Sequence, residues 1–286
     1  MRCCTFILGL LLAAGALIAA HAADPSEEKP LVLAVHPYLP REEILEHFTP
    51  LANYLTRAIG RPVEIRVGRS YAEHIEAVGS DSVDLAYMGP VSYVQTVAKY
   101  GKKPLLARQV VNGNPFLKGE IIVRTDSPLR SLQDLRGKCF TFGDPDSTMS
   151  TILPRWALAQ DGITPSQLGR FRNLESHDDV ALAVLSGDCD AGAVKSEVFQ
   201  KFAPKGLRAL AELPRVHDHV FVTRSTLPQP LIQTLQAALL ALNDIPEGRP
   251  IMAAIHPGMS ALVPAEYNDY ANLRRILMQE KLSLRR

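Results

Sequence analysis

The sequence predicts an α/β protein made of two blocks, each with a largely parallel sheet. Short apolar runs alternate with segments of helical periodicity from residue 31 onward, and the alternation starts again after residue 130. This alternation is typical of parallel α/β sheets. The chain has 286 residues, of which 47% are hydrophobic, so it is long enough for one or two well-buried domains.

The first block alternates strands and helices up to a final pair of strands. Strands are expected at 31–35, 62–67, 83–88, 104–111 and 119–125, and helices at 42–60, 71–79 and 91–101. Pro50 is expected to break the first helix in two, because a proline removes a backbone donor and clashes with the preceding turn. Gly101 is expected to end the third helix.

The second block begins with a short helix at 131–138, where Ser131 and Asp134 have the spacing of a capping box. Pro154 is expected to kink the next helix. Strands are expected at 139–143, 171–176, 190–194, 207–213 and 219–224, and helices at 147–162, 178–188 and 196–203. From Pro228 onward the pattern is mainly helical, so this tail is expected to pack on one of the blocks.

Extended segments near 119–125 and 219–224 are expected to join the blocks and to act as a hinge. The predicted organisation has lobe 1 at 23–121 plus 222–286 and lobe 2 at 122–221. Such folds bind ligands in the cleft outside the carboxyl ends of their parallel strands.

Residues 1–22 have the pattern of a signal peptide. Arg2 precedes an apolar run of 15 residues, and Ala20-His21-Ala22 has the small-x-small form of a cleavage site. We expect cleavage after Ala22. The alternative is an uncleaved anchor, but the run is shorter than the ~20 residues that span a bilayer. The sequence therefore predicts a soluble exported protein that reaches the membrane only through a partner.

The charge and the cysteine content narrow the possible classes of protein function further. Lys plus Arg number 31 and Asp plus Glu number 30, without a basic run, which argues against nucleic-acid binding. Cys3 and Cys4 leave with the signal peptide. Cys139 and Cys189 remain, and a disulfide is reasonable if their strands are neighbours; two separate buried thiols are the alternative.

Two strand-to-helix junctions have the composition of an anion site. Residues 141–151 read TFGDPDSTMST and residues 87–93 read YMGPVSY, so each strand ends near a glycine and a helix with hydroxyl side chains follows. If both junctions face one cleft, their free N–H and O–H groups would favour an anion. We expect Asp144 and Asp146 to shape the turn and cap the helix. The alternative is that Asp146 accepts a hydrogen bond from a protonated oxyanion.

Four segments together resemble the periplasmic phosphate, phosphite and phosphonate-binding proteins of ABC importers, the PhnD-like family. They are FTPLANYLTRAIGRPVEIRVGRSYAEHIEAV, VDLAYMGPVSYV, GEIIVRTDSPLRSLQDLRGKCFTFGDPDST and HDDVALAVLSGDCDAGAV. The resemblance implies a two-lobed type II periplasmic-binding-protein fold, with two mixed sheets joined by a two-strand hinge. It implies a periplasmic protein that captures a small oxyanion or organophosphonate and delivers it to an ABC permease. The alternative is a ligand-binding partner of a histidine kinase or chemoreceptor.

The resemblance also implies ligand-binding residues. These are Tyr71, Tyr87, Gly89, Ser147, Thr148, His177 and Glu197. Four positions depart from the family pattern or match it loosely: Met149 and Ser150 after the paired hydroxyls, Leu117 in place of a tyrosine, and Asp218 near an amine-binding aspartate. The ligand therefore does not follow from the resemblance alone.

Neither a catalytic motif nor a cofactor motif is present: the sequence has no GxSxG, Walker, GxGxxG or HExxH pattern. We therefore expect no enzyme activity and no cofactor. His217 and His219 sit two apart on a predicted strand and are expected to face the same side. A metal site there is conceivable, but structural or ligand-facing histidines are the favoured interpretation.

Overall fold

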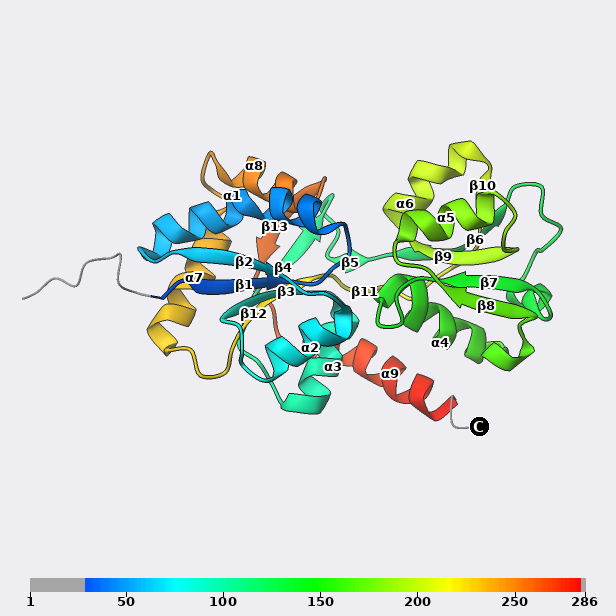
Figure 1. Ribbon diagram of the computed structural model, residues 1–286, viewed down its shortest axis with the longest axis horizontal. Helices are drawn as coiled ribbons and strands as arrows, with labels where there is room; N and C mark the ends of the chain where they lie inside the picture. Colours follow the sequence, from blue (N-terminus) through cyan, green and yellow to red (C-terminus); the bar gives the residue numbers. More distant parts are fainter. Residues whose placement is uncertain (1–28, 284–286) are drawn as a thin grey trace, which may run out of the picture.

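The computed structural model describes residues 29–283, which form two lobes side by side (Figure 1). The expected signal peptide and its cleavage site lie outside the described residues. The α/β architecture with two mixed sheets is confirmed. Among the described residues, no helix combines the length and the hydropathy needed to cross a bilayer.

Lobe 1 contains a six-stranded sheet in the order β13-β4-β12-β3-β1-β2. The strands β1, β2 and β3 are parallel, whereas β12 and β13 run antiparallel to their neighbours. The strands are β1 (Leu31–Val35), β2 (Val63–Val67), β3 (Leu85–Met88), β4 (Leu105–Val111), β12 (Val220–Thr223) and β13 (Met259–Val263). The helices are α1 (Arg41–Ile59), α2 (Tyr71–Gly79), α3 (Pro90–Tyr100), α7 (Gln229–Ala241) and α8 (Gly248–Ile255).

Lobe 2 contains a five-stranded sheet in the order β10-β6-β9-β7-β8. The strands are β6 (Gly119–Arg124), β7 (Cys139–Phe142), β8 (Arg170–Asn173), β9 (Ala191–Lys195) and β10 (Leu207–Glu212). Its helices are α4 (Leu153–Gln160), α5 (His177–Leu185) and α6 (Ser196–Phe202). The expected capping box is present, with Ser131 and Asp134 bonding each other's backbone around a short 3₁₀ turn.

The chain crosses between the lobes at β5 (Phe116–Leu117) and β11 (Val216–His217), which pair as a small antiparallel sheet. The whole of β6 belongs to the second sheet and the whole of β12 to the first. The crossings therefore come a few residues before the expected boundaries. The last helix, α9 (Ala271–Ser283), packs on α3 of lobe 1 and on α4 of lobe 2 (Figure 1).

The expected break at Pro50 is wrong, because α1 continues through this residue. The apolar face of α1, which includes Phe48, Leu51 and Leu55, is fully buried on both sides of the proline. Burial of these side chains, at roughly 1.5–3 kcal/mol each, outweighs the ~3 kcal/mol that an internal proline costs.

The helix expected at 147–162 is divided into two parts. Thr148–Ile152 form a π-helical turn that continues into α4, and Pro154 is the second residue of α4. The tail is mainly helical, as expected, but it also contains a strand that the sequence pattern does not indicate, since β13 pairs with β4 and extends the first sheet. Its five residues are too short a run for periodicity to separate a strand from a helix.

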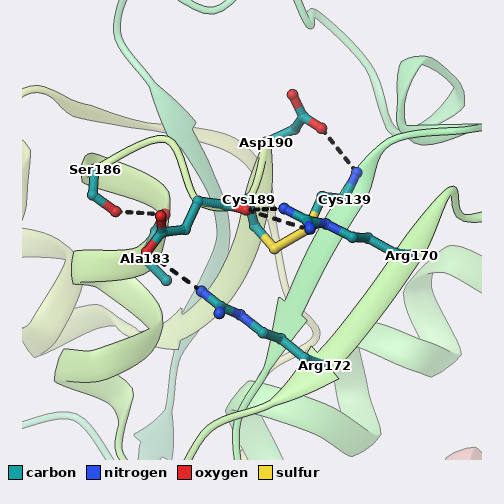
Figure 2. Close-up of a disulfide and its surroundings, with 8 residues drawn as sticks. Cys139, Arg170, Arg172, Ala183, Ser186, Cys189 and Asp190 are labelled. Carbon is teal, nitrogen blue, oxygen red and sulfur yellow. Dashed lines mark hydrogen bonds and ion pairs between the residues drawn. A yellow bond between two sulfur atoms is a disulfide. The ribbon is translucent and has the colours of Figure 1, made fainter.

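Cys139 and Cys189 form a disulfide (Figure 2). Cys139 opens β7 and Cys189 precedes β9, and these two strands pair in parallel. Their Cα atoms are 4.8 Å apart, which lies within the usual range for a bridge. The Asp190 carboxylate accepts a hydrogen bond of 2.8 Å from the Cys139 N–H, so the backbone is also fixed at this point.

Reduction of this disulfide is expected to lower the free energy of unfolding by about 2–4 kcal/mol, because it frees a long loop in the unfolded chain. The two cysteines are 50 residues apart. Urea denaturation with and without dithiothreitol measures the effect. The variants Cys139→Ser and Cys189→Ser serve as controls, since neither should respond to the reductant. An unchanged midpoint for the reduced wild-type protein would contradict the expectation.

Candidate functional site

A small cavity lies between the lobes, with a volume of about 40 Å³. This exceeds the roughly 10–15 Å³ that one water molecule requires, so the cavity suits a molecule of a few heavy atoms. Both lobes and β5 contribute to its wall. The lining residues are His36, Tyr38, Tyr71, Gly89, Leu117, Ser147, Thr148, Met149, His177, Lys195 and His219.

Five chain segments begin a helical turn at the cavity. Each brings a lining residue at or next to the first helical position: Tyr71 in α2, Gly89 before α3, Ser147 and Thr148 at the π turn, His177 in α5 and Lys195 before α6. The first N–H groups of a helix have no intrahelical acceptor, and they carry partial positive charge. The arrangement therefore favours an anion.

Glycines lie at two of these junctions and act differently at each. A Cβ on Gly143 would overlap Ser150, so the strand-to-helix turn after β7 has no room for a side chain. At Gly89 a Cβ would fit, but it would lie 3.6 Å from Nε2 of His219 and 3.8 Å from Nε2 of His36. Gly89 thus leaves open a space on which polar side-chain atoms converge.

The acidic side chains at the π turn shape the loop. Asp144 Oδ1 accepts a hydrogen bond of 2.8 Å from the Asp146 N–H, which closes an Asx-type turn. Asp146 Oδ1 accepts a 3.1 Å bond from Nε2 of Gln95 on α3. Among the described residues that line the cavity, none is Asp or Glu. These contacts favour the interpretation that the two acids shape the turn. In addition, the hydrogen bond between Asp146 and Gln95 links lobe 2 to lobe 1.

The two junctions also touch each other directly. The Val91 N–H in the first turn of α3 donates a 3.2 Å hydrogen bond to Oγ1 of Thr148. Because α3 belongs to lobe 1 and Thr148 to lobe 2, this bond spans the cleft. The structure therefore represents a closed arrangement of the lobes.

Two of the lining histidines are held neutral. Burial, with smaller effects of Lys195 and His219, lowers the pKa of His177 to about 3. Burial and the neighbouring His219 and His74 also hold the pKa of His36 well below its usual value. Lys195 brings an ammonium group to the same lining.

Three rings stack behind the cavity. The ring centroids of Tyr87 and His219 are 5.0 Å apart at 14°, and those of His36 and His219 are 5.2 Å apart at 18°. Tyr87 donates a hydrogen bond from its hydroxyl to Gln109, which is not among the residues that line the cavity. The Asp218 carboxylate is 2.7 Å from Nδ1 of His219 and fixes the orientation of that ring.

Five of the seven residues predicted from the sequence line the cavity: Tyr71, Gly89, Ser147, Thr148 and His177. Tyr87 and Glu197 do not. Tyr87 is 2% exposed and supports the imidazole rings from behind. Glu197 lies in the first turn of α6, where its charge raises the pKa of His256 against the larger effect of burial.

Sequence reasoning missed His36, Tyr38 and Lys195. His36 directly follows β1 and Lys195 is the last residue of β9, so both lie at carboxyl ends of strands, where ligands of such folds bind. That position is the signal that could have identified them. Leu117, Met149 and His219 were noted as exceptions or alternatives, and all three line the cavity.

His217 and His219 do not face the same side, contrary to the expectation. The ring of His217 stacks on that of Phe116, with 4.7 Å between the ring centroids, and its Nδ1 lies 2.7 Å from the Asp269 carbonyl oxygen. His219, by contrast, lines the cavity. The link between β11 and β12 interrupts the strand alternation between them. Within residues 29–283, no group of three or more potential ligands is placed to hold a metal ion.

Comparison with known proteins gives one family. A family model described as "ABC transporter, phosphonate, periplasmic substrate-binding protein" matches residues 33–270. The phosphate-import protein PhnD of Mycolicibacterium smegmatis is 26% identical over 225 residues, covering 72% of this chain and 70% of the relative. The phosphonates-binding periplasmic protein of Escherichia coli is 25% identical over 244 residues, covering 82% of this chain and 71% of the relative.

A solved structure shares the fold closely. PhnD1 from Prochlorococcus marinus, determined in complex with methylphosphonate, has a TM-score of 0.78 and covers 90% of this chain and 99% of that one. The identity is 21%, so this likeness concerns the fold. It supports the two-lobed type II architecture.

The free energy of unfolding is expected to fall between pH 7 and pH 5. The folded-state pKa is about 3 for His177 and about 4 for His74, mainly through burial, against the ordinary pKa of 6.5 for histidine. In this window the unfolded chain binds protons that the folded chain does not, so stability is lost as the pH falls. Urea midpoints at pH 5, 6 and 7 measure the slope. His74→Gln should flatten it, and an unchanged slope would contradict the assignment.

Proposed function

The chain belongs to the family of periplasmic substrate-binding proteins of phosphonate ABC transporters, and from this premise we propose that it captures a small phosphorus oxyanion between its lobes. Delivery of this ligand to an ABC permease completes the function. The observation that carries the proposal is the meeting of five helix starts, three histidines and Lys195 at one cavity without a carboxylate in its described lining.

The donors at the cavity match an oxyanion. Ser147 and Thr148 offer hydroxyl groups beside the N–H groups of the π turn. The Nδ1 atom of His177 accepts a 3.1 Å bond from the Lys195 N–H, so the neutral ring carries its proton on Nε2 and can donate it. Hydrogen bonds to charged groups contribute about 1.5–3 kcal/mol each, and several together give useful affinity.

The size and polarity of the cavity favour a ligand with a small substituent. Leu117 and Met149 add apolar wall to the cavity. The acids that could hold a ligand amine are engaged or absent from the lining, since Asp218 binds His219 and Glu197 lies outside. Phosphate, phosphite and methylphosphonate therefore fit better than aminoalkyl phosphonates.

Ligand binding is coupled to closure of the lobes. The ligand would contact Gly89 of lobe 1 and Thr148 of lobe 2, so its binding energy stabilises the closed form over the open form. This is a hinge motion about β5 and β11. The permease can then distinguish loaded from empty protein by the relative position of the lobes.

The family makes the chain a transport component of the periplasm and not an enzyme. Export by a signal peptide cleaved after Ala22 agrees with this location. The curated relatives are named for import or binding, and delivery to a sensor kinase has no comparable support.

Methylphosphonate, phosphite and phosphate are expected to raise the melting temperature of the protein, because a ligand that binds only the folded state stabilises it. Differential scanning fluorimetry and calorimetry measure the shift and the affinity. No response to any of the three would contradict the proposed function.

Thr148→Val is expected to weaken the binding of the best of these anions by about 10–100-fold, as the loss of a hydrogen bond to a charged group implies. The change also removes the acceptor for Val91. Thr234→Val is the matched control, because Thr234 is exposed on α7 and bonds only within its own helix. Equal affinities for the two variants would exclude Thr148 from the site.

Gly89→Ala is expected to block the site without unfolding the protein. The added methyl group has ordinary contact distances to its neighbours but occupies the space between the polar atoms. Calorimetry should therefore show at least about a tenfold loss of affinity with a nearly unchanged melting temperature of the ligand-free protein. Full binding by this variant would place the ligand elsewhere.

A further inference from the structure

Resting on the proposed function, we propose that the cavity captures its phosphorus oxyanion together with one proton, and that His219 holds this proton against the ligand. His219 is then a specificity-determining residue, because it matches the protonation of the site to the charge of the anion. The inference goes beyond binding of the anion and concerns how its second negative charge is accommodated.

Three polar side-chain atoms converge over Gly89. Measured from the position that a Cβ of Gly89 would occupy, Nε2 of His219 lies at 3.6 Å, Nε2 of His36 at 3.8 Å and Oγ1 of Thr148 at 3.9 Å. An oxygen atom of the ligand placed there would be close to all three. The hydrogen atoms that these groups carry therefore decide what kind of oxygen can bind.

Thr148 can donate to such an oxygen. Its Oγ1 accepts the hydrogen bond from the Val91 N–H. A hydroxyl group has one hydrogen and two lone pairs, so its hydrogen remains for the ligand.

The neutral imidazole of His36 presents a lone pair. Its Nδ1 lies 3.2 Å from the Tyr87 carbonyl oxygen, and a carbonyl oxygen only accepts. The hydrogen of the neutral ring is therefore on Nδ1. The ring is held neutral by burial, which lowers the pKa of His36 well below its usual value. Its Nε2 is thus an acceptor.

Asp218 fixes the tautomer of His219, again with the hydrogen on Nδ1. Both the backbone N–H and Nδ1 of His219 lie 2.7 Å from Asp218 Oδ1. Burial raises the pKa of Asp218, but the hydrogen bonds that its carboxylate accepts from His219 counter this effect, so the pKa of Asp218 is lowered and the carboxylate is ionised. A carboxylate only accepts, so Nδ1 of His219 donates and Nε2 faces the ligand.

With both rings neutral, a fully deprotonated ligand oxygen would face two imidazole lone pairs. That contact is repulsive, because every atom involved is an acceptor. One added proton on His219 turns its Nε2 into a charged donor. The imidazolium then lies between the Asp218 carboxylate and the anion, which stabilise its charge from both sides.

His219 is better placed than His36 to hold the proton. A carboxylate contacts Nδ1 of His219, whereas Nδ1 of His36 meets a carbonyl oxygen. Burial lowers the pKa of His36 most, and a positive charge on His219, His74 or Lys195 would lower it further, so a proton held by His219 disfavours one on His36. Since the centroids of the two rings are 5.2 Å apart, they would not both be charged.

Other titratable groups surround His219, and they come from several helices and strands of both lobes. His36 and Tyr38 follow β1, and Tyr87 is on β3, and each ring stacks on or packs beside that of His219. His177 and Lys195 reach the cavity from lobe 2, and His256 follows α8. Of these, His256 is a further imidazole whose charge interacts with that of His219, so the test must isolate His219.

The test measures proton uptake by calorimetry with methylphosphonate at pH 8 and pH 9, in two buffers of different ionisation enthalpy. The free phosphonate is mainly a dianion in this range. We expect uptake of about one proton per ligand. The dissociation constant should rise about tenfold between pH 8 and pH 9, because binding linked to one proton has this pH dependence. Binding without proton uptake would overturn the inference, whereas no binding of any phosphorus oxyanion would instead overturn the proposed function.

His219→Gln assigns the proton to a residue. The glutamine amide can donate to the ligand but cannot titrate, so uptake should fall to near zero and the affinity should become almost independent of pH. His217→Gln is the matched control, because His217 contacts Phe116 and Asp269 outside the cavity and should retain the wild-type uptake. Full uptake by His219→Gln would place the proton on the ligand or on another base and would overturn the assignment.

A measurement on the ligand-free protein needs neither a variant nor binding. Nitrogen-15 spectra of histidine-labelled protein at pH 8 should show His36 and His219 with hydrogen on Nδ1, and His177 with hydrogen on Nε2. Hydrogen on Nε2 of His36 or His219 would remove the facing lone pairs and would overturn the inference directly.

Discussion

The structure depends on one electrostatic constraint: the positive ends of several helices must meet at a small cavity whose described lining contains no carboxylate. In the described part of the chain this is achieved by α2, α3, the π turn before α4, α5 and α6. Parallel strands in each lobe send successive helix starts to the same sheet edge, and β5 and β11 bring the two edges face to face. The fold therefore determines the sign of the ligand before any single side chain does.

The histidines resolve a conflict that this constraint creates. Burial disfavours charged imidazole, and the helix ends disfavour additional cations, so His36 and His177 are neutral and act through fixed tautomers. Asp218 supplies a countercharge behind the ring of His219 instead of inside the cavity. A negative charge is thus tolerated close to an anion site because an imidazole separates it from the anion.

Much of this arrangement could be predicted from the sequence, for identifiable reasons. Gly89, Ser147 and Thr148 belong to strand-to-helix junctions, whose composition reports local geometry. His36 and Lys195 follow apolar strands as single residues without a motif, so only the assembled sheets bring them together. Tyr87 was placed at the ligand, but the face of β3 on which a residue lies depends on the pairing of that strand. The prediction for Pro50 is wrong because tertiary packing overrides local propensity. The strand β13 was missed because a run of five residues is too short to distinguish a strand from a helix.

The C-terminal helix gives the hinge a mechanical character of its own. Leu273, Ile276 and Leu277 of α9 are buried in a cluster that includes residues of both lobes, and Trp156 of α4 donates a 3.1 Å hydrogen bond to Gln279. A rotation that separates the lobes must peel α9 from α3 or from α4 and expose apolar surface. The helix thus links both lobes outside the cavity and opposes their separation, at residues that lie far along the chain from those that line the cavity.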